Sequence, residues 1–225
     1  MFTDAGKAFE GFLSGCVDSP NNCPLARGNT TAASLGRTLS HFFESIKYQP
    51  IQIGQSIIDY STIKGQIFST LYWPGQWPQL AALLDGLMTG NLTDMGAGSE
   101  DSSSSSPGFS EALAGIKCGD KSTRATSLSD VTPLINKNLQ SIKWFGDVAS
   151  TTAMQCIRWG GKAKERYSGN FHVKTKNPVL LIGNTYDPAT PLVSARNVSA
   201  GLEGSVVLQQ NSYGVRSLSV ILFQL

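Results

Sequence analysis

A carboxylate just past a predicted strand is the most informative chemical group in this sequence. Residues 179–182 form an uninterrupted apolar run between Pro178 and Gly183, which is typical of a strand buried on both faces of a parallel sheet. Asp187 follows, in a turn that contains Pro188. Functional side chains gather beyond the carboxyl ends of such strands. Because Asp in a turn also serves local hydrogen bonds, the sequence leaves a catalytic and a structural role for Asp187 open.

The partners that a carboxylate needs for serine-hydrolase chemistry are scarce. A nucleophilic serine on a strand-to-helix turn is written Gly-x-Ser-x-Gly, and this pentapeptide is absent from the 225 residues. We expect His41 at a partly buried helix edge and His172 in a loop or an edge strand, so either would be catalytic only through tertiary proximity. No metal or cofactor is expected, because the cysteines form no Cys-x-x-Cys pair and both histidines are remote from them.

The chain around Asp187 predicts a strand–helix–strand unit, whereas most of the preceding chain predicts helices. A helix over 192–202 and a second strand over 205–210 would complete the closing half of a doubly wound α/β sheet. Residues 16–29 are expected as a loop and 49–58 as extended chain. The serine-rich stretch 96–108 indicates a flexible surface insertion, with a linker as the alternative. Helical spacing or capping patterns occur over 4–13, 34–47, 59–71, 78–87 and 131–159.

Composition is that of a globular protein without an obvious polyanionic partner. Hydrophobic residues make up 40% and charged residues 15%, and the formal net charge is +2. We therefore expect neither nucleic acid nor an anionic membrane as a partner. No apolar window approaches the roughly 18 residues of a membrane span. The first residues lack the apolar segment of a signal peptide.

Cysteines and glycosylation sequons nevertheless indicate an oxidising compartment. The cysteine count is even, and Asn-x-Ser/Thr sequons occur three times. The alternative is reduced, buried cysteines with chance sequons. A secreted character without a leader predicts that the beginning of the protein is missing. The expected disulfides are Cys16–Cys23 and Cys118–Cys156, and the expected glycosylation sites are Asn29, Asn91 and Asn197.

Two long runs of sequence resemble a known family. Residues 178–192, with the sequence Pro-Val-Leu-Leu-Ile-Gly-Asn-Thr-Tyr-Asp-Pro-Ala-Thr-Pro-Leu, and residues 204–214 look like the C-terminal domain of tripeptidyl-aminopeptidase-like α/β-hydrolases. Residues 9–12 and 58–62 resemble secreted fungal members. The resemblance implies a partial α/β-hydrolase fold, with residues 1–150 as a largely helical cap (lid), 151–214 as the family's C-terminal portion, and 215–225 as an aberrant tail.

The resemblance also implies a Ser–Asp–His triad that hydrolyses peptides or related amides and esters. In chain order the triad runs nucleophile, acid, histidine. Asp187 falls on the family's acid, which would hold the histidine's tautomer. The nucleophile elbow would precede Met1, and the histidine would stand at position 215, where this chain has Val215.

These departures predict a chain without hydrolase activity of its own. We expect residues 215–225 to be read-through of an unspliced intron or a wrongly predicted exon, with a genuine C-terminal strand as the alternative. Two classes of function remain. One is the cap and acid-bearing part of a secreted serine exopeptidase, and the other is a non-catalytic protein that binds peptides or a partner. The sequence indicates no oligomeric state.

Overall fold

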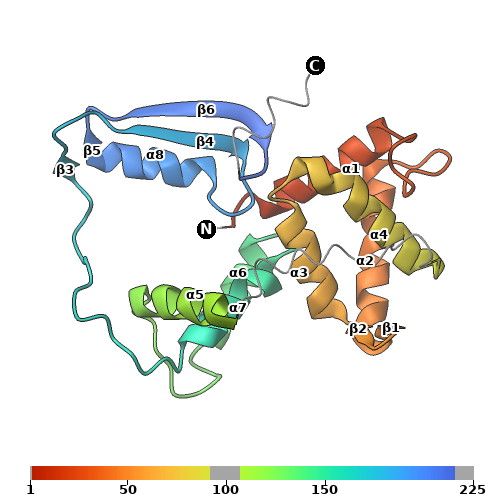
Figure 1. Cartoon of the computed structure of the whole chain (residues 1–225), viewed down its shortest axis with the longest axis horizontal. Helices are drawn as coiled ribbons and strands as arrows, with labels where there is room; N and C mark the ends of the chain where they lie inside the picture. The colour runs from red at the N-terminus through yellow and green to blue at the C-terminus, as the bar shows by residue number, and fades with distance from the viewer. Residues whose placement is uncertain (1, 92–106, 216–225) are drawn as a thin grey trace. The chain divides into compact units, whose positions relative to one another are not determined.

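The computed structural model divides the chain into two compact units (Figure 1). The first unit combines Met1–Asp94 with Phe171–Leu225, and the second is Met95–Asn170. The structure describes residues 2–91 and 107–215, so almost all of the serine-rich stretch 96–108 and residues 216–225 lie outside the described chain. The first unit thus joins N-terminal helices to the C-terminal α/β segment. The expected assignment of 1–150 as a lid and 151–214 as the family's portion stays a prediction.

Four helices and one short 3₁₀ turn build the N-terminal part of the first unit. They are α1 (Ala5–Asp18), α2 (Ala32–Tyr48), α3 (Tyr60–Thr70), η1 (Pro74–Gln76) and α4 (Trp77–Thr89). A hairpin of β1 (Ile51–Ile53) and β2 (Ser56–Ile58) separates α2 from α3. The helices bury their apolar faces together, as the spacing predicts. The most buried side chains include those of Phe9, Phe12, Leu39, Ile46, Ile63, Ile67, Leu71 and Leu84.

Local capping sets several helix boundaries. Thr31 precedes α2, where its hydroxyl accepts a hydrogen bond from the Ser34 N–H in a capping box. Asp59 precedes α3 and accepts from the Thr62 N–H at 2.7 Å, as the sequence predicts. Gly90 ends α4 with a φ of 72°, a left-handed conformation that suits glycine.

Helix α1 is longer than predicted. The expected helix ended near residue 13, with Cys16 in a loop, whereas α1 continues to Asp18. The extension places the Cys16 side chain in the core, where it is 5% exposed and bonded to Cys23. The apolar pattern alone missed this turn because residues 14–15 are Ser and Gly.

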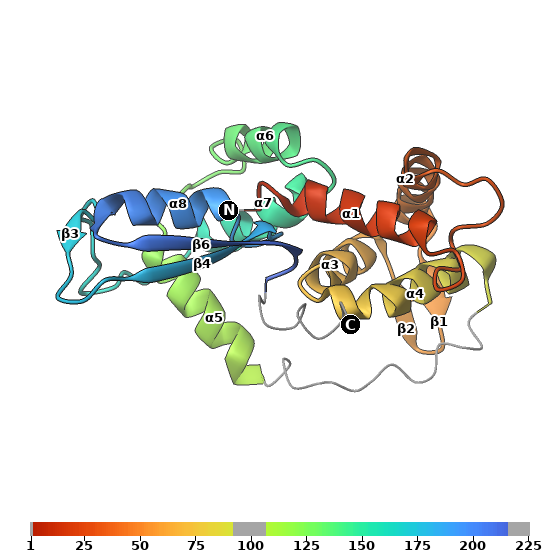
Figure 2. The same cartoon turned by 90° about the horizontal axis from the view of Figure 1, so that it is seen from above.

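The C-terminal part of the first unit is a parallel strand pair with a connecting helix. Strands β4 (Leu180–Tyr186) and β6 (Val206–Tyr213) run parallel, and Ile182 pairs with Leu208. The connecting helix α8 (Leu192–Gly201) lies along them in both views (Figure 2). A second, shorter parallel pair consists of β3 (Val173–Lys174) and β5 (Leu202–Glu203). In the chain, β3 precedes β4, and β5 lies between α8 and β6.

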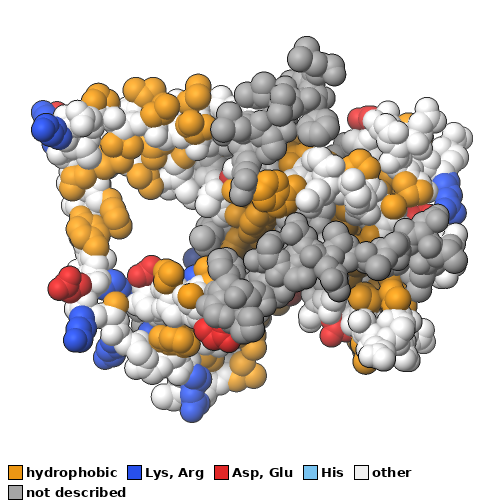
Figure 3. Space-filling model, viewed as in Figure 1, with side chains coloured by type: hydrophobic (Ala, Val, Ile, Leu, Met, Phe, Trp, Pro, Cys, Tyr) orange, Lys and Arg blue, Asp and Glu red, His pale blue; other side chains and the backbone are white. Residues whose placement is uncertain are grey.

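The expectation that the strand at 179–182 is buried on both faces was wrong. Helix α8 covers one face, where an added Cβ on Gly183 would lie 3.0 Å from the Leu192 Cδ1 atom. The opposite face carries four exposed apolar side chains, and Figure 3 shows hydrophobic side chains at the surface in this part of the molecule. The apolar run predicts a strand, but its burial depends on elements outside the run. The four side chains are those of Leu180, Ile182, Val206 and Leu208.

The second unit contains α5 (Pro107–Asp120), α6 (Thr132–Ser141) and α7 (Gly146–Cys156). Its last two helices correct the expectation of one helical stretch over 131–159. The chain turns between them, where Trp144 has a φ of 73°. Gly146 allows the tight return, because a Cβ there would lie 2.6 Å from the Leu139 Cα.

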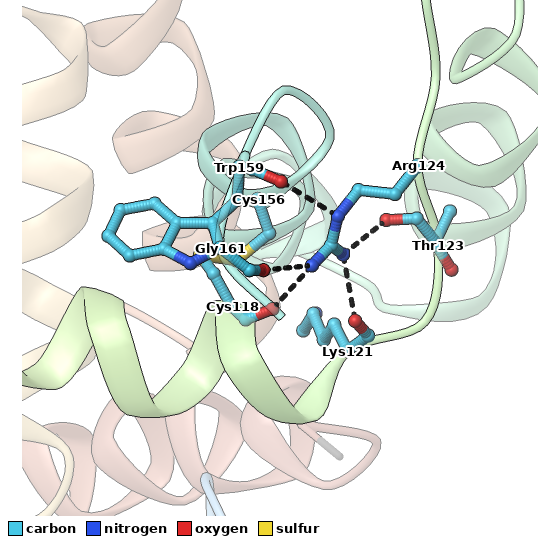
Figure 4. Close-up of a disulfide and its surroundings, with 7 residues drawn as sticks. All are labelled: Cys118, Lys121, Thr123, Arg124, Cys156, Trp159 and Gly161. Atoms are coloured by element: carbon cyan, nitrogen blue, oxygen red, sulfur yellow. Dashed lines mark hydrogen bonds between the residues drawn. A yellow bond between two sulfur atoms is a disulfide. The ribbon is translucent and has the colours of Figure 1, made fainter. Parts of the chain in front are cut away.

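A disulfide and an arginine fix the ends of α5 and α7 in the second unit (Figure 4). Cys118 bonds to Cys156, with 4.8 Å between their Cα atoms. The Arg124 guanidinium beside them donates hydrogen bonds to five backbone carbonyls, which include those of Cys118 at 3.0 Å and Trp159 at 2.9 Å. The guanidinium thus binds carbonyl groups at the end of α5 and in the segment after α7.

Among the helices that the structure describes, none is both long and apolar enough to cross a membrane.

Candidate active site

Asp187 lies one residue beyond the carboxyl end of β4. Its side chain is 3% exposed, in a turn that leads through Pro188 and Pro191 into α8. Position in the fold therefore agrees with the strand–acid–helix order that the sequence predicts. A buried carboxylate requires hydrogen-bond donors to compensate for lost hydration, and the turn supplies them.

Three hydrogen bonds from the turn itself hold the Asp187 carboxylate. Oδ1 accepts from the Ala189 N–H at 2.8 Å and from the Thr190 N–H at 2.7 Å. Oδ2 accepts from the Thr190 hydroxyl at 2.8 Å. An ionised carboxylate offers about four acceptor sites. The structural role of Asp187 is therefore plain, and Oδ2 retains the capacity to accept from a further donor.

The residue after β6 comes to the same edge of the sheet as Asp187. Tyr186 pairs with Tyr213 across the parallel strands, and the Gly214 N–H donates to the Tyr186 carbonyl at 3.2 Å. Parallel strands present their carboxyl ends side by side. Val215, where the resemblance predicts a histidine, directly follows Gly214. Gly214 is itself hydrogen-bonded to Tyr186, the residue before Asp187.

The segment after α3 packs against this turn. The Val215 N–H donates to the Tyr72 carbonyl at 3.2 Å. Gly214 has a φ of 88°, and a Cβ there would lie 2.7 Å from the Pro74 Cδ and 2.8 Å from the Tyr72 carbonyl oxygen. Burial, followed by the negative charge of Asp187, raises the pKa of the Tyr72 phenol. Tyr72 and Pro74 therefore form one side of the candidate site.

A chain of aromatic rings extends from the strand ends into the N-terminal helices. Tyr186 stacks on Tyr213 at 4.7 Å between ring centroids, and Tyr213 meets Trp77 edge-on at 5.5 Å. Trp77 in turn contacts Phe12 at 5.9 Å. Burial is the first cause of the raised pKa of the Tyr213 phenol. These contacts position β6 against α1 and α4.

Two buried polar side chains of β4 and β6 complete the site. The Asn184 side chain donates from Nδ2 to the Gly214 carbonyl at 2.7 Å, which fixes the backbone beside position 215. Asn184 Oδ1 and Ser212 Oγ are buried and have no hydrogen-bond partner within the described chain. Sequence reasoning did not single out Asn184 or Ser212, because an isolated polar residue in a strand gives no sign of which face it occupies.

Neither histidine lies in the candidate site as the structure describes it. His41 is exposed on α2, which corrects the expectation of a partly buried position, since Leu39 and Phe43 supply the buried face. His172 precedes β3 and lies near Gly201, the last residue of α8. Asp187 precedes the first turn of the same helix. Because ten helical residues span roughly 15 Å, His172 and Asp187 lie near opposite ends of α8.

The other expected site residues fall elsewhere. The disulfides join Cys16 to Cys23 and Cys118 to Cys156, which is the expected pairing, and no cysteine is free. Two disulfides suit an extracellular protein. Within residues 2–91 and 107–215, no three His, Cys, Asp or Glu side chains form a group that could hold a metal ion. The sequon residues Asn29, Asn91 and Asn197 are all exposed.

Comparison with known proteins identifies a family for the C-terminal part of the chain. Residues 141–219 match the family model described as TAP-like protein, and no curated protein matches the chain. The matched range includes β4, Asp187, α8 and β6, and the mixture of helices with small parallel sheets is compatible with part of an α/β-hydrolase fold. This chain therefore carries a TAP-like α/β-hydrolase C-terminal region at residues 141–219.

Proposed function

We propose that this chain supplies the triad acid and the helical lid of a secreted serine hydrolase that releases short peptides from the N-termini of its substrates. Asp187 is the acid, and residues 1–150 form the lid in this proposal. A complete site would also contain a serine nucleophile and a histidine. The two disulfides and three exposed sequons support secretion.

One observation carries the proposal: the turn after β6 is hydrogen-bonded to the backbone of Tyr186, the residue before a buried carboxylate that can accept one more hydrogen bond. Within residues 2–91 and 107–215, the Thr190 hydroxyl is the donor to Asp187 Oδ2. A histidine at position 215 would start from the backbone beside it, and a carboxylate so placed holds an imidazole in one tautomer and stabilises the imidazolium. The local hydrogen bonds keep the carboxylate rigid, as such a role requires.

Residues 1–225 alone are proposed to be inactive. They contain no Gly-x-Ser-x-Gly turn, and position 215 is valine. Loss of triad members leaves a rate only roughly 10³–10⁴ above that in water, and this remainder depends on an intact oxyanion hole. The oxyanion hole uses the backbone N–H next to the nucleophile. A fluorophosphonate probe should therefore leave the purified chain unlabelled, and stoichiometric labelling would contradict the proposal.

The role of Asp187 is tested by installing the missing imidazole. In Val215→His, the carboxylate should raise the imidazole pKa from the ordinary value of about 6.5 to about 7.5–8.5. The measurement is an NMR titration, in which one new imidazole joins the two of the parent chain. Adding Asp187→Asn should return the pKa toward 6.5, while the amide oxygen can still accept from the Ala189 and Thr190 N–H groups.

The result also predicts a pH-dependent stability. A raised pKa in the folded state adds stability that is fully present below about pH 6.5 and is lost as pH rises through the folded value. The free energy of unfolding of Val215→His, taken relative to that of the parent, should thus be higher at pH 6 than at pH 9. An imidazole pKa at or below 6.5, insensitive to Asp187→Asn, would remove the support for a triad acid.

A non-catalytic peptide-binding protein is the second candidate. A mostly apolar cavity of about 220 Å³ between α1 and α4 favours it, with Phe12, Trp77 and Pro74 in its wall. Side chains of this kind line sites that accept apolar groups of a ligand. Calorimetry with a mixture of short peptides tests this candidate. Because both candidates expect no turnover from residues 1–225, tight binding is the result that supports the second function.

A further inference from the structure

We propose that a groove in the first unit holds the first N-acetylglucosamine of an N-glycan attached to Asn29. The groove lies between the chain segment 24–30 and helices α2 and α4. The proposal concerns a surface other than the Asp187 site and is independent of hydrolase activity. It requires passage through a secretory compartment, which the two disulfides support.

The groove is large enough for a sugar. Its volume is about 500 Å³, within the range of roughly 300–1,000 Å³ of small-molecule sites. Segment 24–30 supplies one wall, α2 another and α4 the third. The lining includes Arg27, Asn29, Thr38, Asp85, Met88 and Thr89.

The lining suits an acetylated sugar because it contains both polar and apolar groups. The Arg27 Nη2 group donates to both Asp85 oxygens, at 2.8 and 2.7 Å, so charged polar groups of segment 24–30 and of α4 meet at the groove. The Thr38 hydroxyl can donate to and accept from sugar hydroxyls. Met88 offers an apolar surface to the acetyl methyl group. N-acetylglucosamine presents hydroxyls, an amide and a methyl group together.

Asn29 is itself part of the groove, so an attached sugar begins there. It belongs to the sequon Asn29-Thr30-Thr31 and its side chain is exposed. Two local features define the backbone on either side of it. Gly28 precedes it with a φ of 63°, and Thr31 anchors the start of α2 through its capping bond to the Ser34 N–H. The glycan stem would therefore extend from a rigid point rather than from a free loop.

A second sequon flanks the same groove. The Asn91 N–H donates to the Thr89 hydroxyl at 3.4 Å, and Thr89 is a lining residue. Asn29 is preferred as the attachment site because its own side chain lines the groove, whereas Asn91 lies two residues past it. The third sequon residue, Asn197, is exposed on α8 and serves as a matched control.

The test uses the full chain, secreted from a eukaryotic host behind an added signal peptide. Endoglycosidase H leaves one N-acetylglucosamine on each occupied asparagine, whereas peptide N-glycosidase F removes all sugar and leaves aspartate. Mass spectrometry should find Asn29 occupied. The form with one sugar should keep the Tm of the glycoprotein, and the sugar-free form should melt about 2–4 °C lower. Asn29→Asp provides the baseline for the charge left by the second enzyme.

Two further variants make the test specific for the groove. Thr38→Trp fills it and should abolish the Tm difference between the one-sugar and sugar-free forms, whereas Arg37→Trp, on the neighbouring exposed position of α2, should keep it. Asn91→Gln and Asn197→Gln should leave the difference unchanged. An unoccupied Asn29, equal Tm values for the two forms, or a difference that depends on Asn91 would overturn the proposal.

A second measurement does not depend on secretion. N-acetylglucosamine added to the unglycosylated chain should shift the backbone amide signals of Thr38 and Met88 in NMR spectra. Because a short tether gives an effective concentration in the millimolar range, binding of the free sugar with a dissociation constant of millimolar order is sufficient. An absence of shifts at about 100 mM sugar would contradict the proposal, since tethered sugar would then stay out of the groove.

Discussion

Gly214 offers a direct test of how the helices contact the turn beside Asp187. The perturbation is Gly214→Ala, which adds one methyl group. Two costs follow from the structure. The φ of 88° lies in a region where L-residues cost about 1–2 kcal/mol. The new Cβ would also lie 2.7 Å from the Pro74 Cδ and 2.8 Å from the Tyr72 carbonyl oxygen.

Gly204 provides the matched control at the other end of β6. It also has a positive φ, of 75°, but no atom lies within 4 Å of an added Cβ. Gly204→Ala should therefore lose only the conformational term of about 1–2 kcal/mol. Gly214→Ala adds an overpacking cost of about 1–3 kcal/mol, because its neighbours include backbone that cannot rotate away.

The measurement is urea denaturation of both variants and the parent, followed by circular dichroism at constant pH. We expect Gly214→Ala to lower the free energy of unfolding by about 1–3 kcal/mol more than Gly204→Ala. Equal losses for the two variants would refute the contact between the segment after α3 and the turn after β6. Tyr72 would then no longer form one side of the candidate site.

Two further predictions address the helices. Gly11→Ala should destabilise the chain because its Cβ would collide with the Tyr213 ring. Gly15→Ala, whose Cβ would meet no atom within 4 Å, should instead stabilise α1 by up to about 1 kcal/mol. Thermal melting checks both variants, and equal Tm values would contradict the ring contact. Asp59→Ala should lower stability at pH 7, because hydrogen bonds from Thr62 lower the Asp59 pKa. A lowered folded pKa gives stability that is lost as pH falls through it, so the variant and the parent should converge near pH 2, and a constant difference would argue against the cap.

Local chemistry made part of this structure predictable from the sequence. The cap at Asp59 depends on a residue three positions along the chain, and the strand–acid–helix order around Asp187 follows from one apolar run and its flanking turn. These features involve interactions within a few residues, which a sequence pattern reports directly.

The rest depends on partners that are distant in sequence. The positive φ of Trp144, which divides α6 from α7, has no signal in the residues around it. The edge-on contact of Tyr213 with Trp77 joins positions that lie far apart in the chain. The exposure of Leu180 depends on which element covers the sheet, and no pattern within a strand reports that.

In the turn beside Asp187, the groups that position the residues of a triad differ from the groups that would react. Backbone groups do the positioning: the Val215 N–H binds the Tyr72 carbonyl, and the Gly214 N–H binds the Tyr186 carbonyl. Neither bond uses the side chain at position 215. The carboxylate is held in the same way by donors of its own turn, Ala189 and Thr190. A change of side chain at 215 therefore alters the chemistry while leaving the hydrogen bonds that place it. For this reason the pKa of an imidazole introduced there reports on Asp187 itself rather than on a rebuilt loop.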